Sequence, residues 1–251
     1  KLKPYNVASV SPQIVDPETT SVLLTSNVKY ATSNTTKSSD TLKSEIITAI
    51  TNYNTNTLQK FDAVYRHSKL TGIIDDVDTS ILSNITTIKI RKNFAPTLLS
   101  SNKYDIYFRN ALFNPHSGHN ATAGGILSST GFKIDGNDNE MFLDDDGQGN
   151  VRLYYLSSGI RTYVNNTQGT ISYTSGQITL NSLKVASISN IRGVTSTIIE
   201  LTVTPDSNDI VPVRDQIVEI DVSNSGITVS ADTFVGGSAD AGVGYTTTSS
   251  Y

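Results

Sequence analysis

DTLKSEIITAITNYNTNTL, residues 40–58, is the stretch that decides the fold. Its apolar residues recur at steps of three and four, the spacing that places side chains on one face of an α-helix. They are Leu42, Ile46, Ala49, Ile50 and Tyr53. The positions between them are mostly polar, so the stretch predicts an amphipathic helix, with Asp40 or Thr41 as its N-cap.

A second, shorter helix is predicted shortly after the first. Ser68 can cap it, and the spacing of its apolar residues again indicates one buried side. That side consists of Leu70, Ile73, Ile74 and Val77. Phe61, Val64 and Tyr65 form an apolar connection between the two helices. Residues 20–30 (TSVLLTSNVKY) and 86–91 (TTIKIR) are rich in β-branched and aliphatic residues, and each predicts a strand. We expect both helices to pack one face against the sheet that these strands form.

Beyond residue 95 the pattern changes to short strands separated by Pro, Asp, Asn and Gly. The clearest signal is MFLDDDGQGNVRLYYL, residues 141–156, in which two apolar arms flank a turn sequence typical of a β-hairpin. Further strands are expected at 104–108, 131–135, 161–164, 169–173, 177–180, 197–204, 216–222 and 226–230. This spacing predicts an antiparallel β-rich region.

The predicted fold class is therefore α+β. A β-α-α-β assembly module occupies residues 1–95, and the antiparallel β-rich region occupies residues 96–235. Residues 236–251 are rich in Gly, Ser and Thr and could hardly form a core, so we expect an extended C-terminal arm held by a neighbouring chain.

Composition excludes several classes of protein. The sequence of 251 residues contains no cysteine, which excludes a disulfide framework, a thiolate nucleophile and a Cys-based zinc site. No run approaches the roughly 18 apolar residues of a membrane helix. Residues 1–110 carry 13 Lys and Arg against 9 Asp and Glu, a balance of +4, whereas residues 111–251 carry 6 against 14, a balance of −8. The halves therefore face different neighbours, or each other's copies, across a polar interface.

Two stretches could hold a metal ion. His116 and His119 in NPHSGHNATAGG have a compatible spacing, and a hydrolase could combine them with an acid from residues 138–146. No third ligand is identifiable, so a polar surface loop is the preferred interpretation. DDDGQGN begins like a calcium loop, but the twelfth position counted from Asp144 is Tyr155 instead of Glu, so a hairpin turn is preferred.

A third stretch, FDAVYRHSKLTGIIDDVDTSI at residues 61–81, places a basic cluster before an acidic one. On a helix Asp75 and Asp78 share a face, but Asp76 points about 100° away from Asp75. Solvated acids at a helix end are therefore preferred over a metal site. No complete catalytic set is present in the sequence, and its scattered Lys and Arg do not form the basic face that nucleic-acid binding needs.

The order of these elements resembles the baseplate J-like family, and within it the baseplate wedge proteins of contractile-tailed phages. The resemblance covers residues 12–92 and 165–185. It rests on Val15-Asp16-Pro17, Asn54 to Phe61, Arg66-Ser68-Leu70, Ile74-Asp75, Leu82-Ser83 and the hairpin sequence GTISYTSGQITL at 169–180. The resemblance is to the C-terminal portion of such a protein, so we expect this chain to be part of a longer subunit.

The resemblance implies a structural role, without enzymatic activity or a cofactor, in the tail baseplate of a virion assembled in the host cytoplasm. The expected partners are a second copy of the chain, as a homodimer within a six-fold ring, and other baseplate wedge proteins. Nucleic acid, membrane and small-molecule substrates are not expected. The ring is expected to rearrange on sheath contraction. The residues assigned to the core and assembly module are Leu42, Ile46, Ile50, Tyr53, Phe61, Arg66, Ser68, Leu70, Ile73, Ile74 and Asp75. A host-binding β-rich adhesin or tail-fibre-type domain is the alternative, and a metal-dependent hydrolase is a second one.

Overall fold

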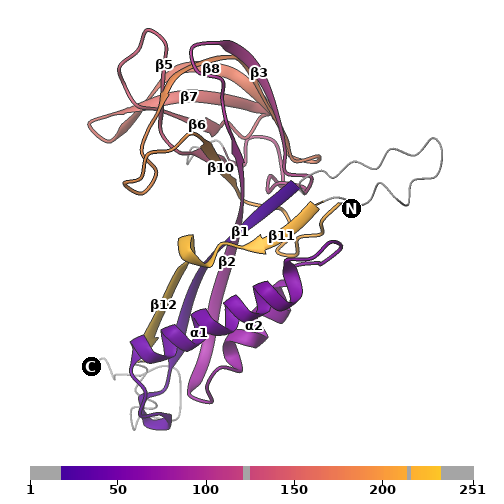
Figure 1. The fold of residues 1–251 in the computed structure, drawn as a ribbon, viewed down its shortest axis with the longest axis vertical. Helices are drawn as coiled ribbons and strands as arrows, with labels where there is room; N and C mark the ends of the chain where they lie inside the picture. The colour runs from indigo at the N-terminus through magenta and orange to yellow at the C-terminus, as the bar shows by residue number, and fades with distance from the viewer. Residues whose placement is uncertain (1–17, 121–124, 214–215, 233–251) are drawn as a thin grey trace, which may run out of the picture.

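The computed structural model describes residues 18–120, 125–213 and 216–232, which form two lobes joined end to end (Figure 1). One lobe is a sheet with two helices packed on it, and the other is built around a second sheet. Val15-Asp16-Pro17 and the expected arm at residues 236–251 lie outside the described residues.

The first sheet is organised around strand β1, which pairs along both of its edges. Its strands are β1 Glu18–Tyr30, β2 Ile81–Phe94, β4 Ser128–Ser129, β10 Ile199–Val203, β11 Gln216–Ile220 and β12 Gly226–Ala231. Along one edge β1 runs antiparallel to β2. Along the other edge it pairs in parallel with β11 beside its first half and with β12 beside its second half. Beyond β2 the sheet continues to β10 and β4.

This arrangement corrects one expectation about the strands near residues 216–231. They were expected in an antiparallel region of their own, but β11 and β12 pair in parallel with β1, about 200 positions earlier in the chain. Local sequence does not reveal the direction of such a pairing, because parallel strands are joined by a long connection instead of a turn. The division of the chain at residues 95 and 235 stays a prediction.

Helices α1 (Ser39–Tyr53) and α2 (His67–Asp75) pack on one face of this sheet. The apolar stripe of α1 is buried against alternate residues of β1, among them Val22, Leu24 and Val28. The opposite face of the sheet is open, and Thr25, Asn27 and Lys29 are exposed on it. The lobe therefore has two layers, with its core between helices and sheet.

The limits of α1 differ from the expected ones at both ends. Ser38 caps the helix, because its side chain accepts a hydrogen bond from the Thr41 N–H at 3.2 Å, so neither Asp40 nor Thr41 is the N-cap. The regular helix ends at Tyr53, and residues Asn54–Leu58 continue as one π-helical turn. The predicted periodicity was correct for the buried face, but it did not reveal this wider turn.

The second lobe is a barrel formed by residues between β2 and β10, apart from β4, which belongs to the first sheet. Its strands are β3 Ser101–Tyr107, β5 Phe132–Ile134, β6 Met141–Asp145, β7 Asn150–Ser157, β8 Ile160–Ser172 and β9 Gln177–Ile188. The antiparallel pairings run from β5 through β6, β7, β8 and β9 and return to β5, so the ring closes, and β3 adds to β9. The segments expected as strands at 161–164 and 169–173 are parts of the single strand β8. At Gly169 a Cβ atom would lie 2.0 Å from the Thr179 carbonyl oxygen, so β8 and β9 approach each other closely only because this residue is Gly.

The α+β class is thus correct in a coarse sense, since two helices accompany a chain that is mostly β. The barrel is an insertion in the first sheet, because β2 leads into it and β10 leads back out. These two strands pair with each other, from Ile199 opposite Phe94 to Val203 opposite Ile90. The points at which the chain enters and leaves the barrel therefore lie side by side.

Replacement of Ile50 by Ala tests the packing of α1. Ile50 is fully buried, so we expect Ile50→Ala to lower the free energy of unfolding in urea by about 2–5 kcal/mol. Thr48→Ala, on the exposed side of the same helix, is the control and should change this free energy by less than about 0.5 kcal/mol. Equal effects would contradict the orientation of α1.

Candidate assembly surfaces

Most apolar residues assigned to the assembly module lie in the core. Leu42, Ile46, Ile50 and Tyr53 of α1 and Leu70 and Ile74 of α2 are buried, and Ile73 is half-buried against them. Phe61 is different, because 59% of its side chain is exposed in the connection between the helices. Tyr65 takes the buried position in that connection and exchanges backbone hydrogen bonds with Ile210.

Helix α2 is capped by a residue distant in sequence. It begins at His67, and the Asp209 carboxylate accepts a hydrogen bond from the His67 N–H at 2.9 Å and pairs with the Arg66 guanidinium at 2.7 Å. The expectation that Ser68 caps the helix was wrong, because Ser68 lies inside the first turn. A carboxylate at this helix end also interacts favourably with the helix dipole.

At the other end of α2, Asp75 links the helix to β2. The Asn84 side-chain amide donates to the Asp75 carboxylate at 2.6 Å and to the Thr71 carbonyl oxygen at 3.1 Å. Asp75 and Asp76 are exposed, as expected for acids at a helix end. Arg66 and Asp75 therefore orient α2 from its two ends.

Asn54, in the π-helical turn, holds β11 in place. Its buried side chain donates to the Ile220 carbonyl oxygen at 3.0 Å and accepts from the Ile220 N–H at 2.8 Å. It thereby satisfies both backbone groups of a strand residue, as a neighbouring strand would. Nothing in the local sequence marks Asn54 for this role.

A chain of ion pairs lies where the two lobes meet. Arg91 is 7% exposed and pairs with Asp221, and its Nη1 atom lies 3.6 Å from Glu200. Glu18 receives Lys92 at 2.7 Å and Arg109 at 3.0 Å. Burial acts to raise the pKa of Glu18, but its two cationic partners outweigh burial and hold that pKa below its usual value. A polar cleft of about 430 Å³ opens beside these pairs.

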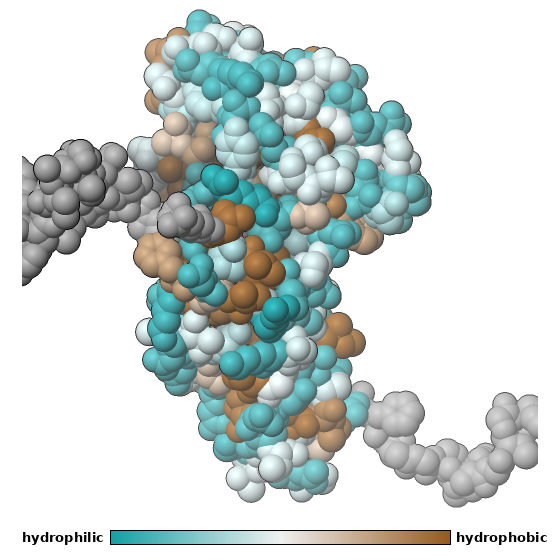
Figure 2. Space-filling model, turned by 90° about the vertical axis from the view of Figure 1, so that its right-hand side faces the viewer, coloured by the Kyte–Doolittle hydropathy of each residue, from teal (hydrophilic) through white to brown (hydrophobic). Residues whose placement is uncertain are grey.

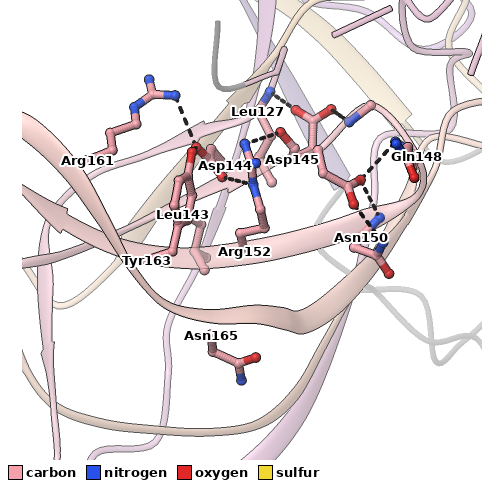
Figure 3. Close-up of polar contacts among 12 residues, drawn as sticks. Leu127, Leu143, Asp144, Asp145, Gln148, Asn150, Arg152, Arg161, Tyr163 and Asn165 are labelled. Atoms are coloured by element: carbon pink, nitrogen blue, oxygen red, sulfur yellow. Dashed lines mark hydrogen bonds and ion pairs between the residues drawn. The ribbon is translucent and has the colours of Figure 1, made fainter. Parts of the chain in front are cut away.

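The DDDGQGN sequence forms the predicted hairpin turn between β6 and β7 (Figure 3). Asp146 accepts from the backbone N–H groups of Gln148 at 2.8 Å and Asn150 at 2.9 Å, which fixes the turn. Asp145 points inward and accepts from the N–H groups of Ile126 and Leu127 at 2.7 and 2.8 Å. These carboxylates thus serve as hydrogen-bond acceptors that order the backbone.

The third carboxylate of the turn, Asp144, lies on the outer side of the barrel beneath a cover of side chains. It pairs with Arg152 at 2.9 Å and Arg161 at 3.0 Å and accepts from the Tyr163 hydroxyl at 2.9 Å (Figure 3). Only 1% of its side chain is exposed. Burial raises the pKa of Asp144, and the two guanidinium groups oppose that rise.

This cover continues into a partly exposed surface of β7 and β8, which we call the barrel patch and in which Tyr154 is buried. The Arg161 guanidinium lies over the Tyr154 ring at 4.9 Å, and the Tyr154 and Tyr163 rings are 5.8 Å apart. Leu156, which lies opposite Arg161 in the pairing, is 51% exposed although it is a large aliphatic residue. Buried anchoring groups in protein interfaces are enriched in Tyr and Arg. The barrel patch consists of Tyr154, Leu156, Arg161 and Tyr163, which the strand pairing places on one face.

The two histidines lie together but without a surrounding ligand set. The His119 Nδ1 and His116 Nε2 atoms are 3.0 Å apart. Among the described residues, no group of three or more His, Cys, Asp or Glu is placed to hold a metal ion. The geometry therefore does not bring His116 and His119 together with an acid from residues 138–146. In the described ranges, no helix has the length and apolarity that crossing a bilayer requires.

Comparison with known proteins gives two matches to phage baseplate proteins. Residues 20–93 match the family model of the baseplate structural protein gp6, C-terminal domain III. The chain is also similar to the baseplate wedge protein gp6 of Enterobacteria phage T4, with 30% identity over 107 residues. The similar region covers 41% of this chain and 16% of that relative, so the chain spans a small part of the relative's length.

These matches confirm the resemblance recognised from the sequence motifs and the location in the tail baseplate of a virion. They also support a structural role in the baseplate. The family match runs from β1 through α1 and α2 to β2, which is the sheet-and-helix part of the first lobe.

The cap on α2 predicts how stability depends on pH. Hydrogen bonds from Arg66 and from the His67 N–H hold the pKa of Asp209 below its ordinary value. The resulting stabilisation is therefore present above the ordinary pKa of an Asp and is lost as pH falls through the lowered one. Asp209→Ala should lower the free energy of unfolding at pH 7 by about 0.5–2 kcal/mol. Urea titrations at pH 7 and in acid should show the difference shrinking in acid, and a constant difference would contradict the role of the charge.

Removal of the Asp144 carboxylate should lower the free energy of unfolding more than removal of the Asp209 carboxylate. Asp144→Ala leaves two guanidinium groups without their buried partner, so we expect the free energy of unfolding to fall by about 3–5 kcal/mol. Asp146→Ala, in the same turn but half-exposed, should cost only about 1 kcal/mol. Thermal and urea unfolding of both variants measure this difference. An equal loss would show that Asp144 acts only through the turn.

Proposed function

We propose that the chain is a structural component of a phage tail baseplate wedge and that it works by self-association and by docking to other wedge proteins. The observation that carries the proposal is the match of residues 20–93 to a domain of a baseplate structural protein. In this proposal the assembled ring changes arrangement on sheath contraction, and the chain serves as a connector without enzymatic activity.

Self-association is assigned to the first lobe, which contains the matched residues. We propose a homodimer within a six-fold ring. The charge balance of +4 in residues 1–110 and −8 in residues 111–251 supports contacts between unlike surfaces of neighbouring subunits. Polar interfaces of this kind suit an assembly that switches between two arrangements, because they can separate without exposing a large apolar surface.

Docking to other wedge proteins is assigned to the barrel patch. Its Tyr and Arg side chains are held in place by Asp144 before any partner arrives, which lowers the entropy cost of binding. Exposed Leu156 adds apolar area at the rim of this ordered cluster. The same patch could serve a host-binding adhesin, but both comparisons favour a baseplate component.

Binding measurements test this proposal directly. The chain should exceed the mass of a monomer in sedimentation experiments and should form a complex when mixed with the other wedge proteins of the same phage. Leu156→Asp should weaken that complex roughly ten-fold or more, because it places a charge on a surface that loses its water when the complex forms. Val211→Asp, at a residue of equal exposure outside the patch, is the matched control and should have little effect. A strictly monomeric chain that binds none of the wedge proteins would overturn the proposal.

A further inference from the structure

Over most of its length, strand β2 forms a free edge of the first sheet. β10 pairs with β2 only from Ile90 to Phe94. From Ile81 to Lys89, β2 pairs with β1 on one side, and no strand within the described residues lies on the other. Backbone N–H and C=O groups on such an edge can pair with another chain.

The sequence of this edge carries little of the usual protection. Natural edge strands are blocked by charged residues, Pro or bulges, but residues 81–89 read ILSNITTIK, in which Lys89 at the end of the free edge is the one charge and no Pro occurs. A bulge is present only at the first end, near Leu82. Ile85 is 69% exposed on the open face of the sheet. Apolar residues also gather over this lobe in Figure 2, whereas the barrel presents mainly polar residues in the same view.

Helix α2 lies beside this edge and carries charges of opposite sign at its two ends. The hydrogen bonds from Asn84 to Thr71 and Asp75 place the helix next to the exposed part of β2. Arg66 and Lys69 are exposed at the start of α2, and Asp75 and Asp76 are exposed at its end. A second α2 in the opposite direction would therefore meet complementary charges.

We propose that β2 pairs with β2 of a second copy, antiparallel across a two-fold axis, so that one continuous sheet runs through the dimer. This inference rests on the proposed self-association and assigns its surface. A two-fold axis perpendicular to the sheet keeps the helices on one side and makes the two α2 helices antiparallel. The basic start of each helix then lies beside the acidic end of the other.

The register of this pairing between the two β2 strands follows from the exposed residue Ile85. With the axis at Ile85, the two Ile85 side chains face each other on the open side, and Ser83 lies opposite Thr87 of the second copy. Lys89 then lies opposite Ile81, so like charges do not face each other across the axis. Pairing covers the exposed Ile85 and satisfies the free backbone groups of both strands at once.

Because the chain contains no cysteine, single substitutions can report the pairing. Ser83→Cys, Ile85→Cys and Thr87→Cys are all on the open face of β2. With the axis at Ile85, Ile85→Cys should form a disulfide between copies under mild oxidation, since this bond needs Cα atoms within about 7 Å. The copies of Ser83→Cys or of Thr87→Cys would lie about 14 Å apart and would cross-link only if the register were shifted. Thr25→Cys is the matched control, because Thr25 is exposed on the same face and pairs with Thr87 in register. Its copies would be separated by three strand spacings and by four residues along the strands, about 20 Å in all, and should not cross-link.

Charge substitution gives a second readout. Ile85→Lys places like charges opposite each other and should raise the dimer dissociation constant roughly ten-fold or more, whereas Asn27→Lys on β1 should not. Cross-linking on β2 above the Thr25→Cys background, with the weaker Ile85→Lys dimer, supports the pairing. If the chain is dimeric in solution but none of the β2 variants cross-links above that background, this inference is overturned and the proposed self-association stands. A chain that is monomeric in solution would overturn both.

Discussion

The fold depends on the pairing of β1 along both edges. This strand lies in the middle of the sheet, and its backbone groups need partners on each side because a buried, unpaired peptide group is costly. β2 supplies one side from the nearby chain, but β11 and β12 supply the other from residues 216–231. The matched region at residues 20–93 is therefore completed by a distant segment. Asn54 secures that segment to the end of α1 through Ile220. The chain shortly before it is held by the pairing of Tyr65 with Ile210 and by Asp209 at the start of α2.

The same requirement explains where the barrel sits. A segment of about 100 residues can be placed between β2 and β10 without disturbing the sheet, because the two strands are neighbours. Arg91 lies at this junction and pairs with Glu200 of β10 and with Asp221 just after β11. One buried guanidinium thus joins three parts of the chain that are far apart in sequence. Breaking such a buried pair is strongly destabilising, which makes the junction a rigid part of the molecule.

The features predicted from sequence were those that depend on neighbouring residues. The spacing of Leu42, Ile46 and Ile50 was sufficient to identify the buried face of α1, and DDDGQGN was sufficient to identify a hairpin. The cap on α2 was assigned to Ser68 because a local Ser is the usual cap, whereas the structure uses Asp209.

A contact between residues far apart in the sequence, such as the cap that Asp209 provides, has no local signature. The same is true of the parallel pairing of β11 and β12 with β1. The barrel patch was also missed, although one signal was present. Arg152, Tyr154 and Leu156 alternate along β7, as do Arg161 and Tyr163 along β8, which indicates one ordered face. The edge sequence of β2, which has no charge before Lys89, could have been noticed, but its exposure follows only from the short length of β10.

The adjacent entry and exit of the barrel have a mechanical consequence. Tension applied to the barrel pulls on β2 and β10 at the same end, so these two strands move together and their mutual hydrogen bonds carry little load. The force passes instead to the long ladder between β1 and β2, from Ser21 opposite Arg91 to Tyr30 opposite Ile81, which is loaded along its length. Its hydrogen bonds lie perpendicular to that force and must yield together instead of one at a time. The molecule is thus built so that a pull between its lobes meets shear resistance.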